Sequence, residues 1–313
     1  MPHCRNNKRQ VLTYSALRCF DECPKRYAWR YQRQLEAIDK PEALVFGTII
    51  HKVLECWFQT SDAQRALELV DRLIPNGGDR WCRARAMIDG YLDRYPTEDF
   101  EVVGVESQFS SRIHNPKTGY KSRRFDIGGK LDLLVKDQHG VWIYDHKTTR
   151  QISGQLIEKL WSDKQLLIYA KYAQEVLGHR IVGCVYDILE KPSLRRRKIK
   201  GTDEHEDDRS FYERLRAWHL DPARYHREQV YYRPQDLYYI GEDIWAATKD
   251  IMAYQKQGYW RRNTNQCLPF VGAKCDYTML CQAHIQPDDE THLIDNHFAI
   301  RERNPELAPE KPF

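Results

Sequence analysis

Long hydrophobic runs are missing from this sequence. No apolar stretch in its 313 residues approaches the roughly 20 residues that a membrane-spanning helix needs. The first eight residues, Met1 to Lys8, lack the apolar centre of a secretory signal peptide. From these absences we expect a soluble, cytoplasmic protein that has no membrane partner.

A strong charge of one sign, internal repeats and low-complexity segments are also absent. Lys and Arg outnumber Asp and Glu by 49 to 45, and this net charge of +4 is too small to identify a nucleic-acid-binding protein. The sequence has no Gly-x4-Gly-Lys-Ser/Thr loop, so it carries no helicase motor of the P-loop type. Hydrophobic residues make up 41% of the chain, which is enough for a sizeable core and excludes global disorder.

Cysteines are present, but their odd number of nine argues against a disulfide framework. Cys267, Cys275 and Cys281 crowd near the end of the chain. Three thiols close together, with one remote partner, can hold an iron–sulfur cluster or a zinc ion. The three scattered cysteines are typical of small buried side chains: Cys56, Cys82 and Cys184.

Hydrophobic periodicity predicts helical segments around a β-rich middle that starts near Phe100. Ser15 is in position to cap the first helix, and Pro24 is expected to break it. The predicted helices cover residues 15–33, 44–58, 63–95 with an interruption at the turn signal 75–78, 155–177 and 240–260. The predicted strands cover 102–109, 125–135, 141–145 and 181–189. This order predicts an α/β fold with a mixed sheet.

Two carboxylates and a lysine fall at the ends of two strands joined by a predicted hairpin. Asp132 lies in the first strand, and Asp145 ends the second, two positions before Lys147. Both carboxylates can converge on one Mg²⁺ or Mn²⁺, with the His146 carbonyl as a further ligand. Since residues i and i+2 of a strand share a face, Lys147 lies where it can orient a hydroxide or neutralise phosphate charge. Ordinary hairpin charges are the alternative, because an Asp-x-Lys triplet alone is common.

These residues resemble the catalytic motif of the PD-(D/E)XK nuclease superfamily, and three other segments resemble motifs of its RecB-like branch. Residues 47–51 are similar to an upstream motif in which a helix histidine, here His51, joins the metal site. Gln165 and Tyr169 are similar to a downstream glutamine–tyrosine motif, and one helical turn between them lets both face the catalytic strands. Residues 15–27 resemble the N-terminal cysteine motif of the branch.

The resemblance implies a restriction-endonuclease-like mixed sheet flanked by helices and a Mg²⁺- or Mn²⁺-dependent deoxyribonuclease. It implies that His51, Asp132, Asp145 and the His146 carbonyl hold the metal, that Lys147 assists the nucleophile, and that Gln165 and Tyr169 position the strand or the site. The expected substrate is single-stranded DNA with a free end, degraded exonucleolytically in recombination, repair or phage DNA processing, with a helicase or recombination partner. The alternatives are a non-catalytic iron–sulfur subunit that binds DNA and a zinc-dependent interaction module.

The cysteines extend the resemblance to AddB-type subunits and CRISPR adaptation exonucleases. These nucleases use one N-terminal and three C-terminal cysteines around a 4Fe–4S cluster, which implies that Cys23, Cys267, Cys275 and Cys281 hold such a cluster and join the chain ends. The gap between Cys267 and Cys275 is wider than the usual pair, a change whose loop-closure cost is small. Zinc, Cys19 as the fourth ligand, and unligated thiols are the alternatives.

The domain organisation expected from these features is a single RecB-like nuclease domain over residues 1–285, followed by an irregular tail, 286–313. Its parts are an N-terminal helical part (1–99), a catalytic α/β core (100–190) and a C-terminal helical and cysteine part (191–285).

Three other features have two interpretations each. Glu106 is a further metal ligand or a strand-edge carboxylate. The basic run 194–200 and the acidic run 203–208 form a solvated loop, or the arginines face phosphate. The aromatic residues Tyr27, Trp29 and Tyr31 belong to the core or stack on bases.

Overall fold

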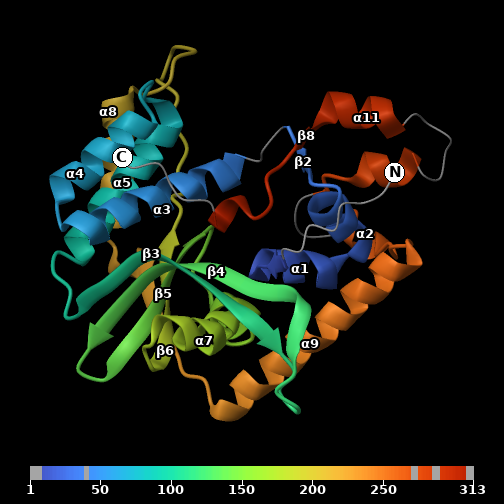
Figure 1. The fold of residues 1–313 in the computed structure, drawn as a ribbon. Helices are drawn as coiled ribbons and strands as arrows, with labels where there is room; N and C mark the ends of the chain where they lie inside the picture. The colour runs from blue at the N-terminus through green and yellow to red at the C-terminus, as the bar shows by residue number, and fades with distance from the viewer. Residues whose placement is uncertain (1–8, 39–41, 269–273, 284–289, 308–313) are drawn as a thin grey trace.

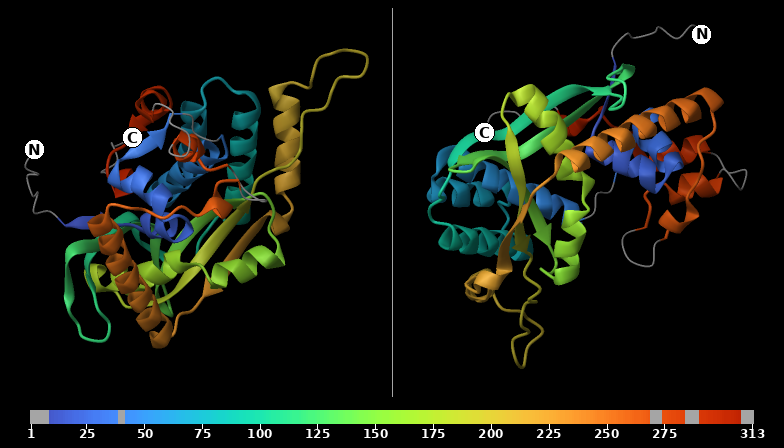
Figure 2. Two further views of the ribbon diagram at one scale, coloured as in Figure 1. Left: turned by 90° about the vertical axis from the view of Figure 1, so that its right-hand side faces the viewer. Right: turned by 90° about the horizontal axis from the view of Figure 1, so that it is seen from below.

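The computed structural model describes residues 9–38, 42–268, 274–283 and 290–307. In this part of the chain a central mixed sheet has helices on both faces (Figures 1 and 2), which confirms the mixed α/β class. None of the helices described is both long enough and apolar enough to span a bilayer.

The central sheet contains parallel and antiparallel pairs in the order β1-β4-β5-β6-β7, with β3 paired to β4 outside this path. The β1/β4 and β5/β6 pairs are parallel, and the other three pairs are antiparallel. Its strands are β1 (Gln10–Leu12), β3 (Glu101–His114), β4 (Lys121–Asp137), β5 (Gly140–Thr149), β6 (Ile181–Glu190) and β7 (Tyr225–Val230).

The long strand β4 changes its partner near the middle. Residues Phe125 to Ile127 pair with β1, whereas β5 pairs with β4 only from Leu133 onward. The stretch that ends at Asp132 therefore lies where the two partner strands diverge. Between residues 128 and 132, the edge of β4 that faces away from β3 pairs with neither β1 nor β5.

One face of the sheet packs against α1 (Tyr14–Glu22), α7 (Lys164–Leu177) and α9 (Pro234–Gln257). Gly129 of β4 makes room for α7: a Cβ there would lie 2.6 Å from the Tyr169 ring and 2.7 Å from the Phe109 ring. Because real Cβ atoms do not approach so closely, glycine at this position allows α7 to bring Tyr169 down onto the sheet.

The opposite face packs against α3 (Glu42–Thr60), α4 (Ala63–Leu73) and α5 (Gly78–Arg94). The helix α8 (Asp208–His219) lies on α5 on the side away from the sheet, where Phe211 and Leu215 are buried against Cys82 and Ala86. The buried residues of α3, among them Ile50, Val53 and Leu54, fix this helix in the core on that face.

The two ends of the described chain pack together beside α1. A small antiparallel sheet joins β2 (Leu35–Ala37) to β8 (Phe298–Ile300). Trp29, Leu280 and Phe298 are buried in one apolar cluster, and Tyr277 OH donates a hydrogen bond of 2.7 Å to the carbonyl of Leu35. The remaining elements of this region are α2 (Pro24–Tyr27), the π-helix η1 (Ala28–Gln32), η3 (Thr264–Gln266), α10 (Thr278–Ala283), α11 (Glu290–His297) and η4 (Pro305–Leu307).

Several element ends differ from the sequence-based expectations. Thr13, rather than Ser15, caps α1, because its side chain accepts a hydrogen bond from the Ala16 amide. The break at Pro24 is confirmed, since α1 ends at Glu22 and α2 begins at the proline. The predicted helix 155–177 is two helices, α6 (Gly154–Trp161) and α7, because Asp163 between them caps α7.

Two segments toward the end of the chain also differ from expectation. The predicted helix 240–260 starts earlier, at Pro234, where proline suits the first helical position. The described part of the segment 286–313, expected to be irregular, contains α11 and β8, because β8 pairs with the distant β2.

Candidate active site

The end of β5 carries a tight ion pair between Asp145 and Lys147. The Lys147 Nζ lies 2.7 Å from Asp145 Oδ2, and alternation along the strand accounts for their shared face. The Asp145 side chain is only 5% exposed, whereas that of Lys147 is 32% exposed. The carboxylate is therefore held inside the protein, and the ammonium lies at the opening toward solvent.

Helix α7 places Gln165 between the two members of this pair. The Gln165 Oε1 accepts a hydrogen bond of 2.8 Å from Lys147 Nζ, and its Nε2 donates one of 2.9 Å to Asp145 Oδ1. One turn later the Tyr169 hydroxyl lies 3.4 Å from Gln165 Nε2. The side-chain amide of Gln165 thus orients both charged groups. Asp163 fixes the start of the helix, because its side chain accepts a hydrogen bond of 2.8 Å from the backbone amide of Gln165.

Asp132 meets His51 across the opposite side of the opening. The His51 Nδ1 of α3 lies 3.3 Å from Asp132 Oδ2, which also accepts a hydrogen bond of 2.9 Å from the His146 backbone amide. The structure therefore brings together side chains from α3, β4, β5 and α7. These are the residues that the sequence analysis singled out: His51, Asp132, Asp145, Lys147, Gln165 and Tyr169.

The charges in this group strongly affect one another. Burial raises the pKa of Asp145, Lys147 opposes this, and the neighbouring Asp132 adds to the rise. Burial would also raise the pKa of Asp132, but His51 outweighs it and holds that carboxyl well below its usual range. For His51, burial disfavours the imidazolium, yet the Asp132 and Asp145 carboxylates raise its pKa. The pKa of Asp132 is lowered and that of its neighbour Asp145 is raised, and a cation placed between them would favour the ionised form of both.

The donor set fits a hard divalent cation. Two carboxylates with an imidazole nearby are ligands suited to Mg²⁺ or Mn²⁺. Among the residues that the structure describes, no three His, Cys, Asp or Glu side chains are arranged to hold a metal ion. In the site, Lys147 and Gln165 contact the Asp145 oxygens, and His51 lies beside Asp132. The His146 carbonyl as a ligand remains a prediction.

A buried polar network lies on the other side of β5 from Asp145 and Lys147, and the sequence analysis missed it. Asp187 of β6 is fully buried; its Oδ2 lies 2.9 Å from His146 Nδ1 and accepts a hydrogen bond of 2.6 Å from Tyr91 OH. Arg227 of β7 donates a hydrogen bond of 3.2 Å to Asp187 Oδ1 and binds both oxygens of Glu98. Although burial alone would raise it, the pKa of Asp187 is lowered to about 2 by Arg227 and His146.

This network supports the site from the far face of β5. The His146 ring stacks on Phe58, with centroids 5.4 Å apart, and meets the His51 ring edge-on at 6.1 Å. Strand alternation was the available signal, because a histidine between Asp145 and Lys147 must face the opposite side of the sheet. Its partners come from remote strands and a helix, which local patterns do not reveal.

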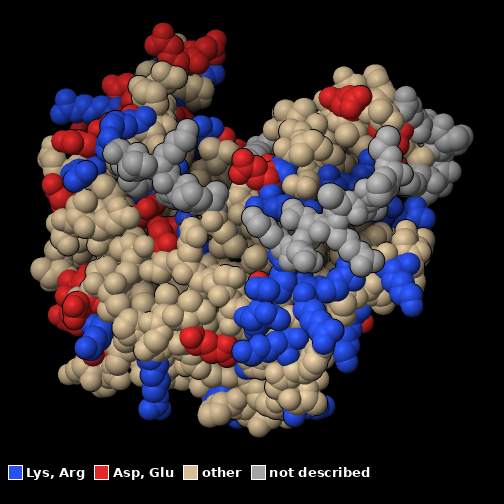
Figure 3. All heavy atoms as spheres, viewed as in Figure 1, with Lys and Arg blue, Asp and Glu red and all other residues tan. Residues whose placement is uncertain are grey.

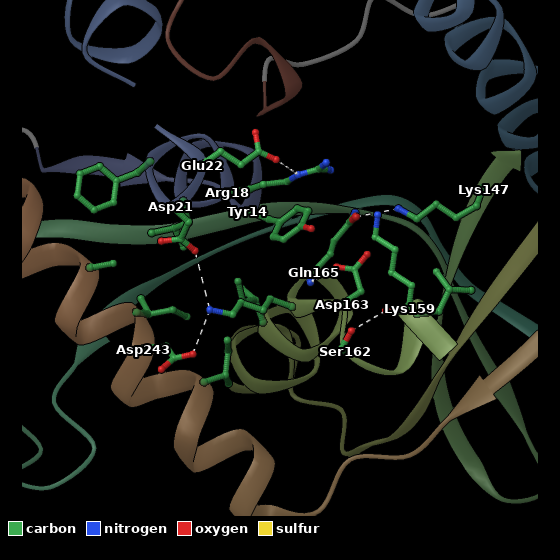
Figure 4. A pocket seen from close by; sticks show the side chains of 18 of the residues that line it. Tyr14, Arg18, Asp21, Glu22, Lys147, Lys159, Ser162, Asp163, Gln165 and Asp243 are labelled. Carbon is green, nitrogen blue, oxygen red and sulfur yellow. Dashed lines mark hydrogen bonds and ion pairs between the residues drawn. The ribbon is translucent and has the colours of Figure 1, made fainter. Parts of the chain in front are cut away.

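A cavity of about 700 Å³ adjoins the Lys147–Gln165 pair (Figure 4). Its walls come from the end of β5, α1, α6, α7 and α9, and include the apolar side chains of Leu156 and Ile244. At its far end Lys164 bridges Asp243, at 3.1 Å, and Asp21, at 3.9 Å. The cavity leaves room for a ligand beside the candidate catalytic lysine.

The four cysteines expected to bind a cluster lie in the region where the chain ends meet. Burial raises the pKa of Cys281, and the nearby thiols of Cys267 and Cys23 raise it further. Burial also raises the pKa of Cys275 to about 11. The Cys23 Sγ accepts a hydrogen bond of 3.4 Å from the Asn263 amide. The Cys19 Sγ accepts a hydrogen bond of 3.4 Å from Arg26 Nε, and Arg26 also interacts electrostatically with Cys275.

The remaining candidates have structural partners. Glu106 of β3 has a φ of 52° and forms an ion pair with Lys130 of β4. In the basic run, Arg196 pairs with Asp79 and Asp208, and Lys198 pairs with Asp203 at 2.7 Å. These contacts favour the strand-edge interpretation of Glu106 and the solvated-loop interpretation of the charge runs.

Comparison with known proteins assigns most of the chain to one family model. The model of the PD-(D/E)XK nuclease superfamily matches residues 11–282, which include all the residues of the site. No curated protein matches the chain at a significant level. Among solved structures, the one titled "Crystal structure of SSO0001" has 12% sequence identity, a TM-score of 0.37 and a match covering 80% of each chain. A likeness at this level supports no conclusion about the chain.

Proposed function

Because the chain belongs to the PD-(D/E)XK nuclease superfamily, whose members generally use Mg²⁺ or Mn²⁺, we propose that it is a metal-dependent deoxyribonuclease. The observation that carries this proposal is the intact set of Asp132, Asp145, Lys147 and Gln165, in which Gln165 is hydrogen-bonded to Lys147 at 2.8 Å and to Asp145 at 2.9 Å. A protein that kept this fold only as a scaffold would not need all four groups.

Each residue has a role in the proposed reaction. Asp132, Asp145 and His51 would hold a divalent cation, which would supply an activated water and neutralise charge on the scissile phosphate. The Lys147 ammonium then directs the attacking oxygen and stabilises charge that develops on the phosphate. Gln165 holds the ammonium in place, and Tyr169 limits the movement of Gln165. The Asp187–His146 network keeps the His146 amide on Asp132, so the carboxylate stays aimed at the opening.

The finer proposal is a RecB-like exonuclease that degrades single-stranded DNA from an end, in the cytoplasm, in recombination, repair or phage DNA processing. It is supported by His51 on α3 and by the Gln165–Tyr169 pair on α7, the two motifs of that branch. The cavity of about 700 Å³ beside Lys147 offers room for nucleotides near the cleavage point. A helicase or recombination partner would supply the single strand.

A 4Fe–4S cluster on Cys23, Cys267, Cys275 and Cys281 is the second part of the proposal, with zinc as the alternative metal. Its support is that the thiol of Cys281 interacts electrostatically with those of Cys267 and Cys23, which come from opposite ends of the chain. Such a cluster would hold the N-terminal helices against the C-terminal segment. The division into one nuclease domain over residues 1–285 belongs to the same proposal.

The test is cleavage of end-labelled single-stranded, double-stranded and circular single-stranded DNA with Mg²⁺ or Mn²⁺. We expect degradation of linear single strands, circular strands left intact, and a rate at least about 100-fold lower for Lys147→Ala with DNA binding retained. Lys136→Ala, an exposed lysine on the same hairpin, is the matched control and should cleave normally.

Equal cleavage by Lys147→Ala and the parent would refute the site assignment. If anaerobically prepared protein with its metal cluster intact cleaves nothing, the alternative of a non-catalytic DNA-binding subunit gains support.

A further inference from the structure

A second cavity, of about 490 Å³, is lined by four arginines and one glutamate. Its walls come from three segments far apart in the chain: the start of β1, the end of η1 with the turn that follows it, and residues 301–304. The charged lining residues are Arg9, Arg30, Arg301, Arg303 and Glu302. Such an excess of guanidinium groups in one concave site makes it attractive to anions.

Two of the arginines in this arginine pocket lie over the ring of Tyr31. The Arg301 guanidinium lies 4.9 Å from the centre of the Tyr31 ring, and the residue is only 7% exposed. The backbone of Arg301 is pinned to Gln34 by hydrogen bonds of 2.7 and 3.0 Å. Arg30 lies 6.0 Å from the same ring and 3.4 Å from Glu36. These contacts orient the two side chains before any ligand arrives.

The other two arginines differ in how far their charge is satisfied. Arg9 donates hydrogen bonds of 2.8 Å to both oxygens of Asp126, which Arg112 also approaches at 3.6 Å. Arg303 is exposed, and its side chain makes no hydrogen bond or ion pair with any residue that the structure describes. Asp126 and Glu36 balance the charges of Arg9 and Arg30, so the remaining arginines leave the pocket with a net positive charge.

The pocket lies on the same face of β4 as the catalytic carboxylate. Asp126 precedes Asp132 by six positions, an even number, so both side chains point to one side of the strand. At about 3.3 Å per residue the separation is roughly 20 Å. Lys and Arg side chains gather on the face seen in Figure 3, over the end of the β3–β4 ribbon beside α1. Arg124 of β4 is exposed and lies two positions before Asp126, so its side chain points to the same side of the strand.

We infer that the arginine pocket binds a phosphate group of the DNA strand, about 20 Å from the catalytic carboxylates. This inference rests on the proposed function as a DNA nuclease. Guanidinium groups match the geometry of phosphate oxygens, and a stacked strand spans about six nucleotides over this distance. Arg303 supplies the uncommitted guanidinium, and Arg301 and Arg30 form the fixed wall. The pocket thus anchors the strand while its other part lies in the active site.

Strand length provides a direct test of this geometry. Binding of 3′-labelled oligodeoxythymidylates of about 4 and about 12 nucleotides would be measured by fluorescence anisotropy without divalent metal. For the longer strand, we expect Arg303→Ala to weaken binding about fivefold. The slope of the logarithm of the binding constant against the logarithm of the salt concentration should become about 0.7 less steep. The shorter strand cannot reach both sites and should bind equally to both proteins. Arg65→Ala, an exposed arginine on α4, is the control and should leave both affinities unchanged.

Two comparisons separate the possible sources of the phosphate and the possible failures. If Arg303→Ala loses affinity only for a longer strand that carries a 5′-phosphate, the pocket binds the phosphate at the strand terminus. If it loses affinity with or without the 5′-phosphate, the pocket binds an internal phosphate. The inference is overturned if Arg303→Ala binds the longer strand with the affinity and salt dependence of the parent. It is also overturned if Arg303→Ala loses as much affinity for the shorter strand as for the longer one. If the parent cleaves no DNA but the length-dependent loss is present, the nuclease proposal fails and the pocket stands.

Discussion

At the scale of single residues, the surroundings of two histidines act on protonation in opposite directions. Carboxylates beside His51 raise its pKa despite burial. His219 is only 2% exposed, and burial together with the nearby Arg224 lowers its pKa to about 3. Its Nδ1 lies 2.9 Å from the hydroxyl of Tyr225, so the neutral ring is part of the packed structure. Protonation of His219 at low pH should therefore destabilise the folded protein.

The stability of the protein should therefore depend on pH through His219. The folded pKa of about 3 is below the ordinary value of 6.5, so the unfolded chain binds the extra proton between these pH values. The contribution of neutral His219 to the free energy of unfolding is complete above pH 6.5. It decreases as the pH is lowered toward 3, by at most about 1.4 kcal/mol per pH unit.

Denaturant unfolding of His219→Gln at several pH values measures this contribution. The gap in stability between parent and variant should narrow as the pH falls, because the variant lacks the titrating ring. His139→Gln, an exposed histidine in the β4–β5 turn, should keep the slope of the parent. Parallel pH profiles for the parent and His219→Gln would contradict the assignment.

At the scale of helices and strands, glycines have different roles at helix starts and helix ends. Helix α9 ends at Gly258, whose φ of +70° is a left-handed conformation that residues with a side chain adopt at a cost. Gly154 begins α6, and its φ lies outside that range. A Cβ at either position would meet no atom within 4 Å, so packing plays no part in the comparison.

These two glycines form a matched pair for mutation. Gly258→Ala should lower the free energy of unfolding by about 1 kcal/mol, because alanine is strained at positive φ. Gly154→Ala should leave stability unchanged or raise it slightly, since alanine favours the helix. Thermal unfolding of both variants checks this expectation, and a destabilised Gly154→Ala beside an unaffected Gly258→Ala would reverse it.

At the scale of the whole molecule, packing between the two ends of the chain links the cysteine region to the arginine pocket. Arg30 lines the pocket and interacts through its guanidinium with Tyr277, which lies between Cys275 and Cys281. The β2–β8 pair places Ile300, next to Arg301, opposite Leu35. A metal that holds the cysteines would also keep the pocket walls in position.

Removal of that metal should therefore affect both stability and DNA binding. Cys281→Ala is expected to lose the bound iron or zinc, to lower the melting temperature by roughly 5–10 °C and to weaken binding of long oligonucleotides. Elemental analysis of anaerobically purified protein, with melting curves and anisotropy, makes the measurement. Cys56→Ala alters a buried thiol of α3 and should keep the metal content of the parent. Equal metal content in Cys281→Ala would exclude this residue as a ligand.

The sequence by itself determined those features that depend on neighbours along the chain. Asp132, Asp145 and Lys147 lie within 16 positions, on two strands whose hairpin turn and alternation are legible in the residues. Gln165 and Tyr169 are one helical turn apart, so their shared face follows from the helical period alone. The α/β class follows for the same reason, because each element has its own local period.

Only the tertiary structure decided which distant segments meet. The Asp187–His146–Tyr91 network joins β5, β6 and α5, and the arginine pocket joins both ends of the described chain. The strand at residues 298–300 also depended on a partner far away in sequence, because it pairs with β2. The physical reason is that local periodicity sets which face of an element is apolar, whereas long-range packing selects the partner that covers it.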